Sequence, residues 1–295
     1  MTTSSTGKYT YKLVEDWVKL PEGIYGGSCN LSTDSQDRVY IFRRRQEPPV
    51  VVCDREGNYL GSWGHGTFIY PHGFHIANDI VYLTDRDTSM CMMYTLDGKP
   101  IQMLGKHGVH SDTGCAKEND PVLRPAGPFN HPTKLVPSPW GDLYVSDGHR
   151  NARVHRFDSG GHLIQSWGTW GKDPGQFHTL HSILVTRDRL VYVCDRENSR
   201  VQVFSADGEF KAMWTDAQRP SDIALTPEGN FVVSEARVRE EGRPHRISIF
   251  DREGRVLSRW ETRGAEGVWV DSGGDIYLAL NRAKSADVDK YVRQG

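Results

Sequence analysis

The stretch that decides the fold is DLYVSDGHRNARVHRFDSGGHLIQSWG, residues 142–168. It contains three short runs in which apolar and polar residues alternate, separated by Asp, Asn and Gly. Alternation with a period of two is typical of half-buried β-strands, and Gly-Gly or Asp-Gly pairs favour tight hairpin turns. The stretch therefore predicts three antiparallel strands joined by turns.

The same pattern recurs along the chain. Residues 190–214, LVYVCDRENSRVQVFSADGEFKAMW, form a second clear copy, and fainter copies span residues 39–64, 80–105 and 231–260. A truncated copy covers residues 275–292, and a short apolar segment that predicts one further strand precedes each copy. Six copies of four strands predict an all-β protein, a six-bladed β-propeller with four antiparallel strands per blade.

The two ends of the chain are expected to share one blade. The final copy stops after its third strand, while residues 11–18, YKLVEDWV, form a strand-like run at the other end. We expect this N-terminal strand to complete the last blade and close the ring, because closure removes an exposed sheet edge. Residues 1–295 would then form a single domain with residues 1–8 as a disordered tail. The long stretch 106–130 is expected as a functional loop where the inner strands begin.

Charge and composition argue against several functions. Lys and Arg number 36 and Asp and Glu 38, so the net charge is −2 and the basic surface of a nucleic-acid-binding protein is not expected. No apolar run approaches the roughly 20 residues of a membrane span, and the N-terminus lacks an apolar signal core. We expect a cytoplasmic protein. The five cysteines contain no C-x-x-C motif, which favours reduced thiols over disulfides or a zinc knuckle.

One position of the inner strands carries metal-ligand residues. Alignment of the six inner segments by their apolar alternation places these residues at one level of the central channel: Cys29, His72, Pro132, His181, Ser221 and Glu266. Two imidazoles and a carboxylate, from His72, His181 and Glu266, match the protein part of a catalytic metal site with open positions. We predict zinc, with iron or another divalent metal as alternatives. The competing interpretation is a set of histidines that only hydrogen-bond inside a polar channel.

Several motifs resemble the NHL-repeat propellers, and among them the family of peptidyl-α-hydroxyglycine amidating lyases, also called peptidylamidoglycolate lyases. The resemblance runs from about residue 20 to the end, and its best matches are VYIFRRR, YPHGF, LYVSDGHRNARV, GQFHTLHSILV and VCDRENSRVQVF. It implies a catalytic zinc held by three channel histidines. Two of them match His72 and His181, and Glu266 stands at the third position.

The resemblance implies roles for further residues. It implies that Arg44 binds a substrate carboxylate and that Arg196 is a second active-site arginine, although Arg196 suits a structural ion pair between blades equally well. His149 replaces the tyrosine proposed as the family's base, and an imidazole with a pKa near 6.5 suits proton transfer; the alternative is a polar turn residue. The family's structural calcium uses an aspartate whose position is Gly267 here, so this site lacks one ligand.

Together these residues predict an enzyme, a metal-dependent lyase acting on a small substrate with a hydroxyl or carbonyl group. The metal coordinates the substrate oxygen, His149 moves the proton, Arg44 and Arg196 orient an anionic or carbonyl group, and a C–N or C–O bond breaks; the reverse reaction is a hydration. The alternatives are a metal-dependent hydrolase of an ester, lactone or amide, and a non-catalytic NHL scaffold that binds a partner. The substrate and the oligomeric state are not specified by the sequence.

Overall fold

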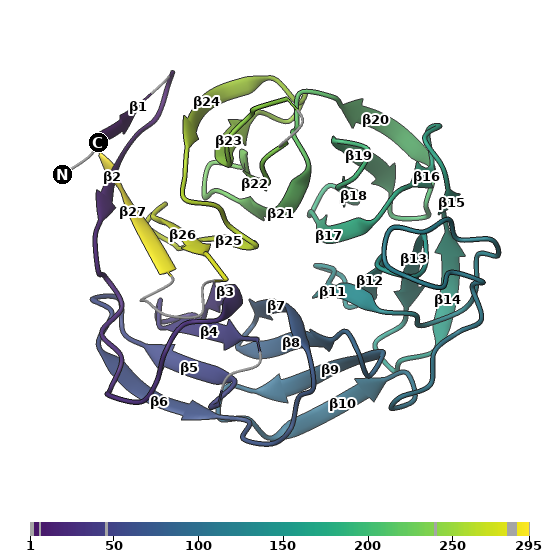
Figure 1. Cartoon of the computed structure of the whole chain (residues 1–295), viewed down its shortest axis with the longest axis horizontal. Helices are drawn as coiled ribbons and strands as arrows, with labels where there is room; N and C mark the ends of the chain where they lie inside the picture. Colours follow the sequence, from purple (N-terminus) through teal and green to yellow (C-terminus); the bar gives the residue numbers. More distant parts are fainter. Residues whose placement is uncertain (1–2, 6, 45–46, 239–240, 282–287, 295) are drawn as a thin grey trace. The chain divides into compact units, whose positions relative to one another are not determined.

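The protein consists almost entirely of β-strands. The computed structural model describes residues 3–5, 7–44, 47–238, 241–281 and 288–294. Its strands form six sheets of at least four antiparallel strands and one short parallel pair, and no helix occurs in the described ranges (Figure 1). None of these ranges therefore offers a helix long and apolar enough to cross a membrane. The predicted all-β, six-bladed propeller with four antiparallel strands per blade is confirmed.

The strands fall into two compact units. Unit 1 comprises residues 1–71 and 216–295, and unit 2 comprises residues 72–215. Each unit holds three of the larger sheets, which we call blades one, five and six in unit 1 and, apart from Pro71 at the start of blade two, blades two, three and four in unit 2. The single domain predicted over residues 1–295 stays a prediction.

Unit 1 contains the first and the last two blades. Blade one consists of β3 (Ser28–Thr33), β4 (Val39–Arg43), β5 (Val50–Cys53) and β6 (Tyr59–Trp63). Blade five consists of β21 (Pro220–Leu225), β22 (Phe231–Glu235), β23 (Arg246–Phe250) and β24 (Val256–Glu261). Blade six consists of β25 (Gly267–Val270), β26 (Ile276–Ala279), β27 (Val288–Gln294), β2 (Thr10–Val14) and β1 (Thr3–Ser5).

Blade six combines both ends of the chain, as predicted. Strand β2 pairs antiparallel with β27, with Lys12 opposite Val292, and the N- and C-terminal segments lie side by side in Figure 1. In place of the expected disordered tail over residues 1–8, Thr3–Ser5 form β1, which pairs with β2. Residues 1, 2 and 6 of that tail lie outside the described residues. The N-terminus thus supplies two strands to this sheet.

Unit 2 contains the three middle blades. Blade two consists of β7 (Pro71–Ala77), β8 (Ile80–Asp85), β9 (Met90–Thr95) and β10 (Pro100–Leu104). Blade three consists of β11 (Pro132–Pro137), β12 (Leu143–Asp147), β13 (Arg153–Phe157) and β14 (Leu163–Trp167). Blade four consists of β17 (Leu180–Val185), β18 (Leu190–Asp195), β19 (Arg200–Ser205) and β20 (Phe210–Trp214). The parallel pair is β15 (Thr169–Trp170) with β16 (Gln176–Phe177).

A β-bulge recurs near the start of the inner strands. The pairing of β17 with β18 skips His181, and equivalent shifts skip Cys29 in β3 and Ser221 in β21. In β11 the skipped residue is Thr133, so the alignment that put Pro132 at this position was wrong by one residue. A bulge leaves its extra residue unpaired and re-aims the side chain, and such bulges are common beside active sites.

Candidate metal centre

Three histidines of unit 2 form a compact cluster. The ligand nitrogens of His72, His149 and His181 all lie within 4.8 Å of one another, and the three side chains are buried. The ring centroids of His72 lie 4.9 Å from those of His149 and of His181. Within the described ranges this is the one group of three or more His, Cys, Asp or Glu side chains close enough to share an ion. The cluster can therefore hold a metal.

Two glycines allow the three histidines to approach. Gly73 follows His72 in β7, and a Cβ at Gly73 would lie 2.3 Å from the carbonyl oxygen of Thr133 in β11. Gly148 precedes His149, and a Cβ there would lie 1.9 Å from the carbonyl oxygen of Leu180 in β17. Distances this short exclude any side chain, so glycine is required by close backbone contact. Each glycine brings its blade against the inner strand of the next.

His149 occupies a repeated position after the second strand of a blade. Its backbone N–H donates to the carbonyl oxygen of His131 at 3.3 Å, and in blade four Arg196 donates in the same way to Thr179 at 3.1 Å. In blade one, Arg44 donates to Gly27 at 2.7 Å. The three residues named from the family resemblance therefore stand at one structural position of three different blades.

Hydrogen bonds fix the orientation of His72. Its Nδ1 lies 2.8 Å from the carbonyl oxygen of Thr133, and since a carbonyl can only accept, this nitrogen carries the proton. The Nε2 lone pair of His72 then faces the cluster, where the Nε2 of His149 lies 2.9 Å away. A metal-ligating histidine usually donates the N–H of one ring nitrogen to a carbonyl or carboxylate and binds the metal through the other nitrogen.

Burial keeps His149 uncharged. Removal from water lowers the pKa of His149 well below its usual value of about 6.5, and the nearby His72, His181, Arg196 and Arg86 lower it further. The Nδ1 atom of His149 is buried and makes no hydrogen bond within the described residues. Neutral imidazoles are the form that binds a metal ion, so the donor set and its electrostatics fit a metal.

The long loop between β10 and β11 reaches the cluster. Glu118 places Oε2 at 3.7 Å from His149 Nδ1, and its Oε1 accepts from Arg86 at 2.5 Å. The next residue, Asn119, accepts a hydrogen bond from the hydroxyl of Thr179 at 3.0 Å. Because Thr179 directly precedes the inner strand β17, the loop lies where the inner strands begin, as predicted. Glu118 itself was not among the residues predicted from the sequence.

Glu266 and Arg44 pair with each other in unit 1. The Arg44 Nη2 lies 3.1 Å from Glu266 Oε1, and the guanidinium also donates to the carbonyl of Pro71 at 3.0 Å and covers the ring of Tyr70. Burial works against the charge on Arg44, but Glu266 outweighs it, so the pKa of Arg44 is raised. The structure thus joins Glu266 to an arginine and joins His72 and His181 to His149. The role of Glu266 as a ligand stays a prediction.

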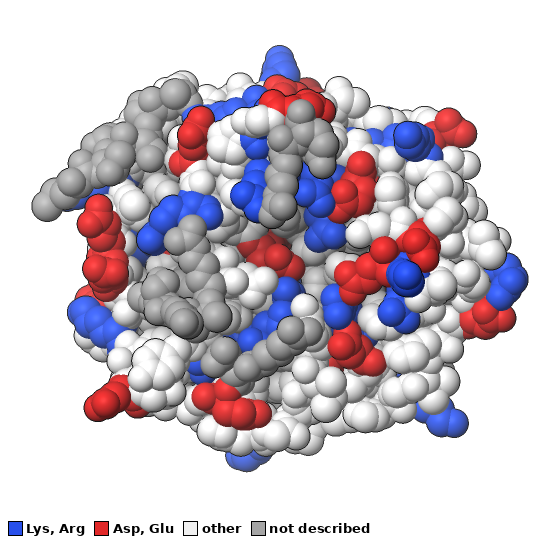
Figure 2. All heavy atoms as spheres, viewed as in Figure 1, with Lys and Arg blue, Asp and Glu red and all other residues white. Residues whose placement is uncertain are grey.

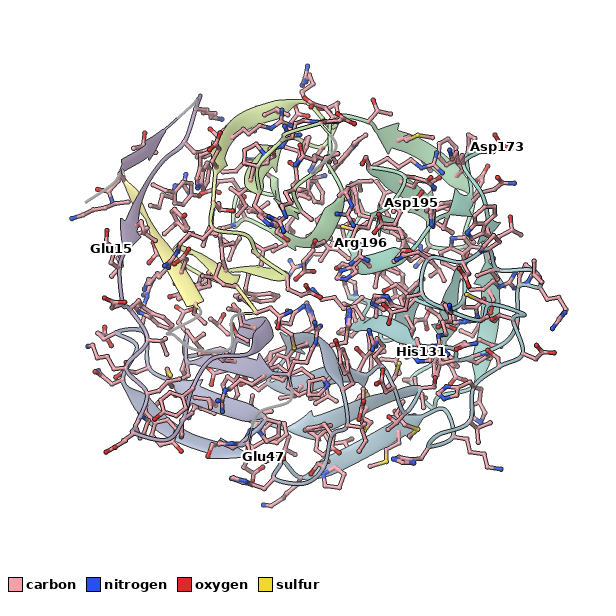
Figure 3. The ribbon with its side chains drawn as sticks, in the orientation of Figure 1. Glu15, Glu47, His131, Asp173, Asp195 and Arg196 are labelled. Carbon is pink, nitrogen blue, oxygen red and sulfur yellow. The ribbon has the colours of Figure 1, made fainter. Side chains whose placement is uncertain are left out.

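Arg196 lies in the turn after β18, on the same unit as the histidines (Figure 3). Its Nε donates to the carboxylate of the adjacent Glu197 at 2.8 Å. Arg196 is also close enough to His149 to lower the pKa of that imidazole. The arginine therefore pairs within its own turn, and its role at the site stays a prediction.

Charged side chains are mixed over the visible surface. On the face seen in Figure 2, blue Lys and Arg side chains and red Asp and Glu side chains are interspersed rather than gathered by sign. This pattern agrees with the net charge of −2. Charge near the histidines is local and comes from pairs such as Arg86 with Glu118 and Arg196 with Glu197.

The fold and the site together define the class of protein: a β-propeller with a buried histidine cluster. Comparison with known sequences adds relatives to this description. The family model of the NHL repeat matches residues 177–204. NHL repeat-containing protein 3 of Homo sapiens is 29% identical over 244 residues, which cover 77% of this chain and 67% of that protein. Peptidyl-alpha-hydroxyglycine alpha-amidating lyase 1 of Drosophila melanogaster is 30% identical over 219 residues, which cover 67% of this chain and 38% of that protein.

Solved structures agree on the fold. A gluconolactonase of Xanthomonas campestris superposes with a TM-score of 0.63 at 13% sequence identity, covering 92% of this chain and 88% of that one. The chain is an NHL-repeat propeller that resembles the amidating lyases, and this resemblance, predicted from the sequence motifs, is confirmed. The chain spans about two thirds of the length of the human relative and less than half of the length of the fly enzyme.

Proposed function

We propose that the histidine cluster binds a divalent metal and that the protein is a metal-dependent lyase for a small substrate with a hydroxyl or carbonyl group. The observation that carries the proposal is the convergence of His72, His149 and His181 within 4.8 Å in a buried site. Three imidazoles suit zinc, and iron or another divalent metal is compatible with the same donors. When bound, such an ion polarises a substrate oxygen or lowers the pKa of bound water.

We assign different roles to the three histidines. His72 is oriented by the Thr133 carbonyl, and His181 is presented by the bulge of β17. For His149 two roles remain, a third ligand or the proton-transferring group predicted from the sequence. Its Nε2 lies 2.9 Å from the Nε2 of His72, which supports the ligand role. The predicted ligand Glu266 would then be dispensable for metal binding.

The substrate class is inferred from the relatives and the surrounding charges. The named activity of the fly relative, an amidating lyase, favours cleavage of a C–N or C–O bond over hydrolysis. Arg196, which pairs with Glu197 and is close enough to His149 to lower its pKa, would orient a carbonyl or anionic group. We further propose a cytoplasmic location and a small molecule, rather than nucleic acid or membrane, as the binding partner.

Elemental analysis of protein purified without a metal-affinity tag tests the metal. We expect about one zinc or iron per chain, lost in His72→Ala and His181→Ala and kept in the control His162→Ala, whose side chain is exposed and pairs with the turn residue Asp158. Wild-type protein that binds no divalent metal would refute the proposal. His149→Ala separates the two roles: metal is lost if His149 is a ligand, whereas turnover alone is lost if it moves the proton.

Product analysis separates the lyase from the hydrolase. Turnover in water labelled with oxygen-18 incorporates label into the acid product of an ester, lactone or amide hydrolase. Elimination across a C–N or C–O bond produces a carbonyl or alkene without forming a new carboxylate. Metal-free protein that instead retains a macromolecular partner would favour the non-catalytic scaffold.

A further inference from the structure

We propose that Glu118 is the positioning residue of the histidine cluster: when a metal is bound, its carboxylate accepts a hydrogen bond from Nδ1 of His149 and so keeps the Nε2 lone pair directed at the metal. The inference rests on the proposed metal site. It assigns a function to the long loop between β10 and β11, which supplies Glu118 from outside the repeated blades.

The contact between the two side chains is specific in direction. Glu118 Oε2 lies 3.7 Å from Nδ1 of His149, the nitrogen on the far side of the ring from His72. This Nδ1 is buried and makes no hydrogen bond within the described part of the chain. A shift of about half an ångström would bring the pair to hydrogen-bond distance. Glu118 is thus the carboxylate positioned to accept a hydrogen bond from Nδ1 of His149.

The tautomers of the two histidines make this contact dependent on metal. His72 carries its proton on Nδ1, so the 2.9 Å contact between the Nε2 atoms requires His149 to donate from Nε2. The Nδ1 lone pair of His149 then faces a carboxylate, which is repulsive. Ligation of a metal needs the Nε2 lone pair and therefore moves the proton to Nδ1, which can then donate a hydrogen bond to Glu118. The carboxylate therefore favours the ligating tautomer over the other.

The loop tip is held on both sides of His149. On one side, Arg86 in blade two binds the second oxygen of Glu118 at 2.5 Å. On the other side, Thr179 in blade four donates to the Asn119 side chain at 3.0 Å, and His178 approaches the Asn119 carbonyl at 3.4 Å. These contacts leave Oε2 of Glu118 facing the imidazole. Carboxylates that orient metal-ligating histidines in this way commonly change metal affinity about 10–100-fold when replaced.

The test measures zinc affinity directly. We expect Glu118→Gln to weaken the dissociation constant for Zn²⁺ about 10–100-fold in competition with a chromophoric chelator. The matched control is Asp112→Asn, which removes an exposed carboxylate of the same loop whose partner is Arg124, and should leave the affinity unchanged. Melting of each variant in excess chelator reports whether it folds.

A second measurement uses the wild-type chain alone, so the proposal stays testable if the variant is unstable. Long-range ¹⁵N–¹H correlation of the His149 ring should show the proton on Nε2 without metal and on Nδ1 with Zn²⁺. An unchanged zinc affinity in folded Glu118→Gln, or a proton on Nε2 in both states, would overturn the role of Glu118 while leaving the metal site intact. Absence of zinc binding by the wild type would refute the proposed function itself.

Discussion

Replacing Gly148 by alanine should destabilise the protein and weaken metal binding together. The added Cβ would lie 1.9 Å from the carbonyl oxygen of Leu180 and 2.6 Å from its carbonyl carbon and its nitrogen. Non-bonded heavy atoms keep about 3.5 Å apart, so the turn and β17 must separate by more than about 1 Å. Gly148 does not adopt a positive φ, so the conflict is purely one of space.

The expected magnitude follows from two losses. Forcing a methyl group into a filled space costs about 1–3 kcal/mol. The hydroxyl of Thr133 also donates to the Leu180 carbonyl at 2.9 Å, and losing this buried bond costs about 1 kcal/mol more. For 295 residues the unfolding entropy is about 0.6 kcal/mol per kelvin, so a loss of about 2–4 kcal/mol lowers Tm by about 3–7 °C.

The assay compares Gly148→Ala with a matched glycine of the same unit. A Cβ at Gly127 would have nothing within 4 Å, and Gly127 has no positive φ, so Gly127→Ala should change stability by less than about 1 kcal/mol. Calorimetry in excess chelator measures Tm without metal, and zinc competition measures affinity. A Gly148→Ala protein with the same Tm as the wild type would refute the close contact between Gly148 and Leu180. A destabilised variant with unchanged zinc affinity would show that Gly148 does not position His149.

Three other perturbations have definite expected outcomes. Burial lowers the pKa of His75 to about 3, against about 6.5 in the unfolded chain. Above pH 6.5 the imidazole is neutral in both states, and as the pH falls toward 3 only the unfolded state takes up the proton, so the free energy of unfolding falls by about 4–5 kcal/mol. Urea unfolding of His75→Leu in chelator should therefore depend less on pH over that range. Deletion of residues 1–15 removes β2 and exposes the edge of β27, so size-exclusion chromatography should show aggregation that the full chain does not. Arg44→Met removes the arginine that pairs with the partly buried Glu266 and should cost about 1–3 kcal/mol in urea unfolding, most of it recovered in the double variant with Glu266→Gln.

The propeller could be predicted because hairpin patterns are local. Strands such as β12 and β18 are buried at all or nearly all of their residues, so their Val and Tyr runs stand out between Gly and Asp turns. Strand β1 was missed because Thr3–Ser5 are all polar, so the alternation of apolar and polar residues that marks the other strands is absent. The slip at Pro132 has a similar cause, since a bulge adds one residue without any side-chain signature and shifts the register to Thr133.

The candidate site was predicted in part for the same reason. His72 and His181 stand at a position that every blade repeats, so alignment of the blades was sufficient to find them. His149 was found through the family motif, but its contact with His72 depends on the close approach at Gly148, which no spacing rule reveals. Glu118 comes from a loop outside the repeat, where only the length of the insertion signalled a function.

The pairing of Glu266 with Arg44 bears on substrate recognition. In the family that the chain resembles, the position of Glu266 is a zinc-binding histidine and that of Arg44 binds a substrate carboxylate. Here Glu266 pairs with the guanidinium of Arg44 at 3.1 Å, and this guanidinium is the group to which the resemblance assigns a substrate carboxylate. A substrate acid would have to displace this partner from a largely buried arginine, and would meet the like charge of Glu266. We therefore expect the substrate to lack a carboxylate at this position, and Glu266→His to restore affinity for one, measured as a lower KM or Kd for carboxylate-bearing over neutral analogues.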